Sequence, residues 1–352
     1  MVISGMRRKF LLYGLVFVLS LGRVLSENQT TANPEPDRIS QWRKELGNGS
    51  AEDRLRLIET IKAKYFKLPS TPSLSSAPDE LAPALVQLGI RLVSSDLRPY
   101  RTEVLSKRCA YVRFGSWSQA LGDELDSAIA DCKTRGLAGL IVDLRTSDAS
   151  FDPGLIAALA SRFVNPHKDL FELHTSAGSE TIRSGVNPVT YTGPLAVVIN
   201  SNVTGSAEVF AAVLKAQVHA LLIGQTTATT TPVLITTQWS NRKISIPAGT
   251  ISILGLDAPL GPALAPDIVV QVSLTEEAAV LAETDSGPIE PSTEDQPRRH
   301  IDEAALVAGT NPELDVFEAE QSGKSPAPKL RDVTLQRAVD FLVTVNLLRK
   351  QK

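Results

Sequence analysis

The sequence predicts an α/β fold, in which a layered core of strands and helices carries small helical extensions at both ends. The first observation is that, from residue 109 onward, segments of strand character alternate with segments whose apolar residues recur at helical spacing. The second is that several strand segments are unbroken apolar runs, as in Leu137–Arg145, which is typical of strands buried on both faces. Helices interleaved with such strands indicate parallel pairing.

The elements of this core can be placed along the chain. Ala110–Phe114 alternates as a strand, and the helix expected over 118–134 has Leu121, Leu125 and Ile129 on one face. The remaining expected elements are buried strands over 137–145, 194–200 and 219–224, helices over 152–163 and 208–216, and alternating strands over 233–239 and 243–254.

The regions on either side of the core are expected to be helical or linking. Ser50 to Asp53 resembles a helix cap, and the apolar residues after it keep helical spacing to about Ala63. A second short helix is expected at 38–46, and a final helix with an apolar stripe at 331–342. The predicted boundaries are 1–26 (signal peptide), 27–108 (helical region and linker), 109–273 (α/β domain), 274–298 (acidic, Pro-rich linker) and 299–352 (C-terminal helical segment).

Composition limits the classes of function. With 352 residues, 43% of them apolar and 21% charged, the chain can bury a sizeable core and is neither disordered nor a membrane bundle. Its formal net charge is −3 and it has no basic block, which argues against nucleic acid as the main partner. The two cysteines match no zinc pattern. A Cys109–Cys132 disulfide and two buried free thiols are equally open.

The N-terminus is predicted to be a secretory signal peptide. Arg7, Arg8 and Lys9 precede an apolar stretch over 10–22, and the residues around Ser26 suit cleavage after it. The stretch has 13 residues, fewer than the ~20 that cross a bilayer. We therefore expect an exported, periplasmic or secreted protein with no membrane span after cleavage, and an uncleaved N-terminal anchor is the alternative.

One segment suggests chemistry. It consists of the strand 194–200, the loop Ser201–Ser206 and the helix that follows, and it would place backbone N–H groups at a helix N-terminus, where they suit an oxyanion or a nucleophile. Thr204, Gly205 and Ser206 are also ordinary cap and turn residues. No nucleotide-binding loop is present, so no cofactor or metal is expected. The histidines lie in no metal or triad motif: His167, His174, His219 and His300.

Several segments, taken in order, resemble one family. They are Gly139–Arg145, Gly205–Ala212, Leu221–Thr227, Gly261 and Pro266–Val270. They are similar to the Asp-Leu-Arg strand end, the Ser-Ala-Ser-Ala-Ser-Glu helix start, the third strand ending in Gly-Glu and the closing Pro-Asp of the C-terminal processing, or tail-specific, serine peptidases. The resemblance covers about 109–273 and implies that family's catalytic domain, with its ClpP- or crotonase-like core.

The same resemblance implies a degenerate active site. The family's nucleophilic serine corresponds to Gly205, its general-base lysine to Thr230, and the glutamine that orients the lysine to Leu234. The turn that supplies an oxyanion-hole N–H in the family corresponds to Thr146–Ser150, which shares none of its Asn-Asn-Pro-Gly-Gly sequence. A serine–lysine peptidase needs a hydroxyl beside a neutral amine. No part of the dyad is therefore expected to be intact.

Three hypotheses follow for the function. The favoured one is an exported, non-catalytic relative of these peptidases that binds a polypeptide or a partner protease. The second is an active serine endopeptidase with a displaced nucleophile such as Ser206. The nearest basic residues downstream of it, Lys215, Arg242 and Lys243, do not take the place of the lysine. The third is a structural envelope scaffold without an open cleft.

Overall fold

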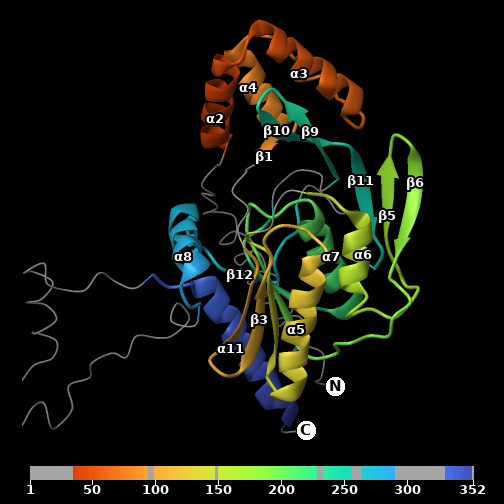
Figure 1. Cartoon of the computed structure of the whole chain (residues 1–352), viewed down its shortest axis with the longest axis vertical. Helices are drawn as coiled ribbons and strands as arrows, with labels where there is room; N and C mark the ends of the chain where they lie inside the picture. The colour runs from red at the N-terminus through yellow and green to blue at the C-terminus, as the bar shows by residue number, and fades with distance from the viewer. Residues whose placement is uncertain are drawn as a thin grey trace, which may run out of the picture.

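The computed structural model describes residues 35–93, 99–146, 150–227, 233–255, 263–289 and 330–350 (Figure 1). The predicted signal peptide and Thr230 lie outside these residues. Within the described ranges, no helix combines the length and the apolar character that crossing a bilayer would require.

A six-stranded sheet forms the centre of the molecule, in the order β12-β8-β7-β4-β3-β2. Neighbouring strands from β3 to β12 pair in parallel, and β2 joins β3 as an antiparallel edge. Every residue of β3, β4 and β7 is buried. The sequence predicted this burial on both faces for β4 and β7, whereas the segment of β3 was predicted to alternate. The α/β class is confirmed. The bounds are β2 Arg101–Leu105, β3 Cys109–Arg113, β4 Gly139–Asp143, β7 Leu195–Ile199, β8 Leu221–Gly224 and β12 Ile268–Val269.

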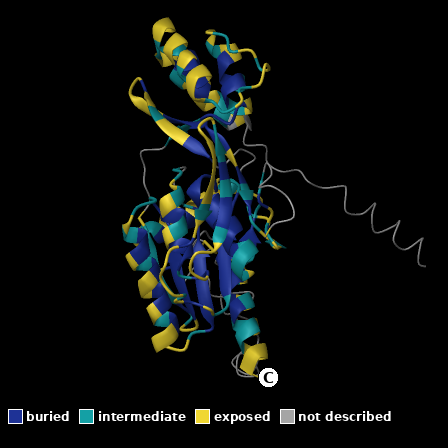
Figure 2. Ribbon diagram, turned by 90° about the vertical axis from the view of Figure 1, so that its right-hand side faces the viewer, coloured by how far each residue is buried: buried dark blue, intermediate teal, exposed yellow. Residues whose placement is uncertain are grey.

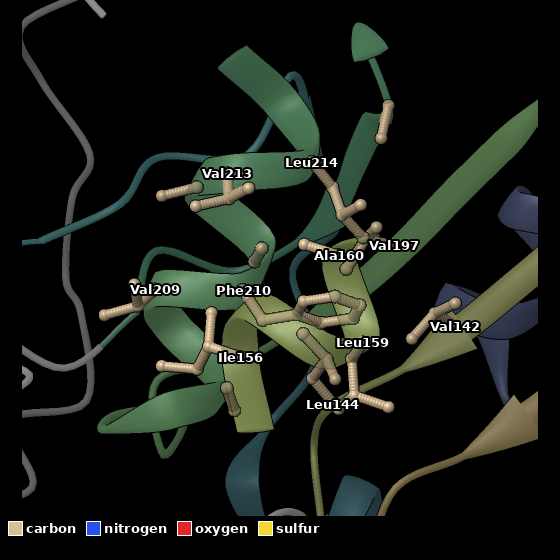
Figure 3. Close-up of a cluster of buried hydrophobic side chains, with 14 of the residues drawn as sticks. Val142, Leu144, Ile156, Leu159, Ala160, Val197, Val209, Phe210, Val213 and Leu214 are labelled. Atoms are coloured by element: carbon tan, nitrogen blue, oxygen red, sulfur yellow. The ribbon is translucent and has the colours of Figure 1, made fainter. Parts of the chain in front are cut away.

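Helices cover both faces of this sheet. Helices α5, α6 and α7 pack on one face, where Phe210 of α7 points between Leu159 of α6 and the strands (Figure 3). Helix α11 covers the other face, with Leu335 and Leu342 against the apolar side chains of the central strands. The bounds are α5 Ala120–Thr134, α6 Pro153–Ala160, α7 Ser206–Val218 and α11 Val333–Lys350.

A second unit, called the head below, consists of helices α2 to α4 on the antiparallel sheet β1-β10-β9. Its core includes Trp42 and Trp239, whose ring centroids are 5.9 Å apart. The predicted cap at the start of α3 is confirmed as a capping box between Ser50 and Asp53. In Figure 2 much of the outer surface of the head helices is exposed. The bounds are α2 Glu35–Asn48, α3 Ala51–Lys64, α4 Pro78–Gln87, β1 Arg91–Val93, β9 Leu234–Trp239 and β10 Arg242–Pro247.

A third sheet, in the order β11-β5-β6, packs beside α7 through Leu173 and Ile251. The β5–β6 hairpin was not predicted from the sequence, because its strands carry many charged and hydroxyl residues and β6 is mostly exposed. The predicted strand over 243–254 is wrong as one element, since Ala248 separates β10 from β11. The bounds are β5 Asp169–Thr175, β6 Gly178–Arg183 and β11 Gly249–Ile253.

Two predictions about the flanking regions are corrected. Helix α8, Leu274–Ser286, occupies the first half of the predicted 274–298 linker. It forms because Ser273 and Glu276 make a capping box and because Val280 and Leu281 are buried, which the acidic composition concealed. The region 27–108 is not only helix and linker, because β1 and β2 lie within it. Strand β1 pairs with β10, which is distant in the sequence, and β2 pairs with β3 of the central sheet.

The two cysteines are both free and both buried. Cys109 lies on β3 and Cys132 on α5. Burial raises the pKa of the Cys109 thiol to about 12 and that of the Cys132 thiol to about 11. Both side chains are therefore protonated packing residues at neutral pH, and neither is a candidate nucleophile.

Candidate functional site

The turn between β7 and α7 has the strand–turn–helix geometry that the sequence suggested. Gly205 is the N-cap of α7, with φ 64° and ψ −138°. This region of backbone conformation is open to glycine and strained for other residues. The nine residues that follow Gly205 are all buried, so α7 enters the core immediately. At the position of the expected nucleophile the turn carries only a hydrogen atom.

Ser206 does not take over as a free nucleophile. Its side chain is completely buried, and its Oγ accepts a hydrogen bond of 2.8 Å from the backbone N–H of Asp152. Its own backbone N–H donates to the carbonyl oxygen of Ser150 at 2.7 Å. The N–H after the nucleophile position is the usual donor to an oxyanion in a turn of this kind. Here both polar groups of Ser206 hold the segment that leads into α6.

The first three lysines and arginines after Ser206 in the sequence do not lie beside its hydroxyl. Lys215 is nine residues further along α7, about 14 Å by helix rise, and its Nζ lies 2.7 Å from a carboxylate oxygen of Asp267. Arg242 pairs with Glu45 inside the head at 2.7 Å. Lys243 is exposed on β10. None of the three is available as a general base for Ser206.

Of the two other family-equivalent positions, the structure describes Leu234 alone. Leu234 is the first residue of β9, where it is buried and pairs with Pro247 of β10. An isobutyl side chain offers no oxygen or nitrogen that could orient an amine. Thr230 is outside the described residues, so the structure places only one of these two positions.

Glu208 is the titratable group that the sequence matched to the family's motif but gave no role. It lies on the first turn of α7 and is 1% exposed. Its Oε1 accepts a hydrogen bond from the Thr227 hydroxyl, and its Oε2 is buried without a hydrogen-bond partner. Burial raises its pKa to about 8, against the opposing effects of Thr227, of the Arg91 charge and of the Leu264 N–H. The sequence signal that could have indicated a buried acid is the single carboxylate among the mostly apolar residues at the start of α7.

Replacing Glu208 by glutamine should remove a pH dependence of stability. Between its usual pKa of 4.5 and its folded pKa of about 8, the folded chain holds a proton that the unfolded chain has lost. The free energy of unfolding therefore falls as pH rises through this window, by up to ~1.4 kcal/mol per pH unit. Urea unfolding from pH 5 to pH 8 should show this slope in the wild type and a flatter one in Glu208→Gln.

The exposed Glu59 of α3 supplies the matched control for that comparison. Glu59→Gln should keep the wild-type slope. Parallel slopes for Glu208→Gln and the wild type would show that Glu208 is ionised in the folded protein.

An imidazole and two serine hydroxyls do meet, but on another surface. His174 Nδ1 lies 2.8 Å from Ser179 Oγ, and its Nε2 lies 3.4 Å from Ser252 Oγ. These residues alternate along their strands with Leu173 and Ile251, which face α7. The cluster therefore lies on the opposite, solvent side of the β11-β5-β6 sheet from the Gly205 turn.

Histidine-based or metal chemistry has no further support in the described residues. His167 and His219 have positive φ and lie in connecting segments, and His300 is outside the described ranges. Among the described residues, no group of three or more His, Cys, Asp or Glu side chains is arranged to hold a metal ion.

Comparison with known proteins gives a consistent family. Residues 108–251 match the model of peptidase family S41. This stretch begins just before β3, ends within β11 and includes the Gly205 turn. The carboxy-terminal processing protease CtpA of Bacillus subtilis (strain 168) is 24% identical over 142 residues, which are 40% of this chain and 30% of that protein. The similarity to CtpA thus spans less than a third of its length.

Solved structures with a similar fold include two bacterial proteins. A putative peptidase from Parabacteroides merdae ATCC 43184 is 19% identical with a TM-score of 0.42, over 55% of this chain and 68% of that one. A lipoprotein from Streptococcus agalactiae is 18% identical with a TM-score of 0.42, over 67% of this chain and 97% of that one.

Proposed function

We propose that the chain, whose residues 108–251 match the model of peptidase family S41, is an exported, non-catalytic member of that family that binds a polypeptide or a partner protease. The observation that carries the proposal is the state of the β7–α7 turn. Gly205 has no hydroxyl, and both polar groups of Ser206 are used within the protein. Acyl transfer needs an attacking oxygen, a base and free N–H donors for the oxyanion.

The loss of these groups should leave little residual hydrolysis. In a comparable serine protease, removal of the nucleophile or the base alone costs about a millionfold in rate, and the activity that remains depends on the oxyanion hole. The N–H of Ser206, which would serve that hole, is donated to Ser150. A displaced peptidase site at Ser206 is disfavoured for the same reason, and the cations considered for it are engaged elsewhere or exposed in the head.

The binding role follows from what the turn retains. The inference rests on the fold, the strand–turn–helix and the head, which are all present although the catalytic groups are missing. Export is supported by the basic start and the apolar stretch over 10–22. The structural scaffold is the second candidate, because Ser206 and Glu208 at the turn are both buried.

The test is incubation of the purified chain with unfolded proteins that end in apolar residues. No turnover is expected, and Ser206→Ala and Ser252→Ala should match the wild type in fragment analysis by mass spectrometry. The second variant removes the hydroxyl beside His174. Turnover that Ser206→Ala abolishes would make the chain an active peptidase, and turnover that only Ser252→Ala abolishes would move the chemistry to the outer sheet.

Binding is measured separately on an array of peptides with free and blocked C-termini. A peptide-binding relative should prefer some sequences or termini. A scaffold should show no preference, and that result would replace the binding role by the structural one.

A further inference from the structure

We propose that the end of the molecule opposite the head is a docking surface for an anionic lipid membrane. It is called the basic end below and is formed by Lys107, Arg108, Lys133, Arg135, Arg349 and Lys350, together with two exposed leucines of α11. This role is independent of whether the chain binds peptides.

The topology of the parallel sheet brings the first four of these residues together. Strands β3 and β4 run in the same direction, so the β2–β3 turn and the end of α5, which leads into β4, lie at one edge of the sheet. The backbone N–H of Ala138, just before β4, donates to the carbonyl oxygen of Arg108 at 2.6 Å. Lys107 and Arg108 in the turn and Lys133 and Arg135 at the end of α5 are all exposed.

Helix α11 extends beyond the same edge. Leu342 contacts Gly139, the first residue of β4, so closely that a Cβ on Gly139 would lie 2.9 Å from it. The helix continues to Lys350, about 12 Å further along its axis at 1.5 Å per residue. In Figure 1 the ends of α5 and α11 both lie at the pole away from the head, on opposite faces of the central sheet. Leu347 and Leu348 there are 58% and 59% exposed.

Most charges of the basic end are not neutralised by a neighbouring carboxylate. Within the described part of the chain, Lys107, Arg108, Lys133, Arg349 and Lys350 form no ion pair, and Arg135 only reaches Asp131 at 3.9 Å. By contrast, Arg113 in the interior is paired with Asp285, and Arg242 in the head is paired with Glu45. A chain of net charge −3 therefore carries one strongly positive end, which no basic block in the sequence revealed.

The exposed leucines decide which anionic partner fits. Clustered lysines and arginines attract any polyanion, whereas two neighbouring exposed leucines gain nothing from water and fit the apolar boundary below lipid headgroups. Basic side chains beside them would contact the headgroup phosphates. An acidic protein or a nucleic acid would use the charges and leave the leucines in water.

The experiment uses a fluorophore that responds to its surroundings, attached to a cysteine in Leu348→Cys of the full chain. The native cysteines are buried, so the new one can be labelled selectively. The control carries the label in Glu59→Cys on the head. Vesicles contain phosphatidylcholine alone or mixed with phosphatidylglycerol. Because the label reports contact at its own position, binding through another part of the chain, such as residues 10–22, does not mimic the signal.

We expect a blue-shifted, brighter signal from position 348 with phosphatidylglycerol vesicles at low salt, and none from position 59. Lys107→Gln with Arg108→Gln should lower the apparent affinity about tenfold or more. The matched pair Lys44→Gln with Lys62→Gln, exposed on the head, should change it little. The proposal is overturned by no response at position 348, by equal effects of the two double variants, or by a response to polyglutamate or DNA in place of vesicles.

Discussion

Replacement of Arg145 by methionine should lower the free energy of unfolding by about 3–5 kcal/mol, the cost of removing one partner from a buried ionic group. The Arg145 side chain is 1% exposed and contacts three carboxylates. They come from three parts of the chain: Asp143 at the end of β4 at 2.7 Å, Glu277 on α8 at 3.2 Å and Asp332 before α11 at 2.6 Å. Without the guanidinium, three buried carboxylates face one another.

The loss of stability in Arg145→Met should depend on pH, and the pKa of Asp143 determines the direction of that dependence. Burial would raise the pKa of Asp143, but the charge and hydrogen bonds of Arg145 outweigh it and hold that pKa below its usual 3.8. In the wild type this contribution is present above pH 3.8 and is lost as pH falls through the lower folded value. In Arg145→Met the carboxylates take up protons more readily, so the loss of stability should be smaller at pH 5 than at pH 7.

Urea unfolding at the two pH values measures both effects. Arg56→Met is the matched control, because Arg56 forms an exposed pair with Glu52 and its loss should change stability by less than about 0.5 kcal/mol. Equal stability of Arg145→Met and the wild type, or a deficit that does not depend on pH, would show that the cluster is already protonated or hydrated.

The same cluster shows what the sequence could predict of the fold and what it could not. The central strands β4, β7 and β8 were predictable because burial on both faces leaves an apolar run, and all three lie where such runs occur. Helix α8 was missed because Glu277 and its neighbours look like a solvated linker. One of those acids is instead neutralised by Arg145, 132 residues earlier in the chain, and no local pattern encodes such a contact.

Some features of the candidate site could likewise be predicted from the sequence, and others could not. The absence of a hydroxyl at Gly205 is a property of the residue type and needed no coordinates. The engagement of Ser206 with Ser150 and Asp152, and the burial of Glu208 against Thr227, depend on segments far apart in sequence. The basic end is likewise assembled from a turn and two helix ends. Spacing along one segment predicts residue roles, whereas burial and pairing follow from the tertiary fold.

Gly224→Ala should be the most damaging substitution of a single small residue, with a loss of more than about 4 kcal/mol or failure to fold. Gly224 ends β8 with φ 129°. A Cβ there would lie 2.0 Å from the carbonyl oxygen of Ile199 on the neighbouring strand β7. That oxygen belongs to the backbone of a central strand and accepts the Gln225 N–H at 3.1 Å, so it has no room to withdraw.

Gly47→Ala is the control for Gly224→Ala, because a Cβ at Gly47 would meet no heavy atom within 4 Å. Gly47 lies in α2, where alanine should leave stability unchanged or raise it by up to ~1 kcal/mol. Circular dichroism and urea unfolding of the two variants measure the contrast. A Gly224→Ala protein as stable as Gly47→Ala would mean that β7 and β8 can separate at this end. The segment that brings Thr227 to Glu208 would then be adjustable, and the closed state of the β7–α7 turn would not be fixed by the sheet.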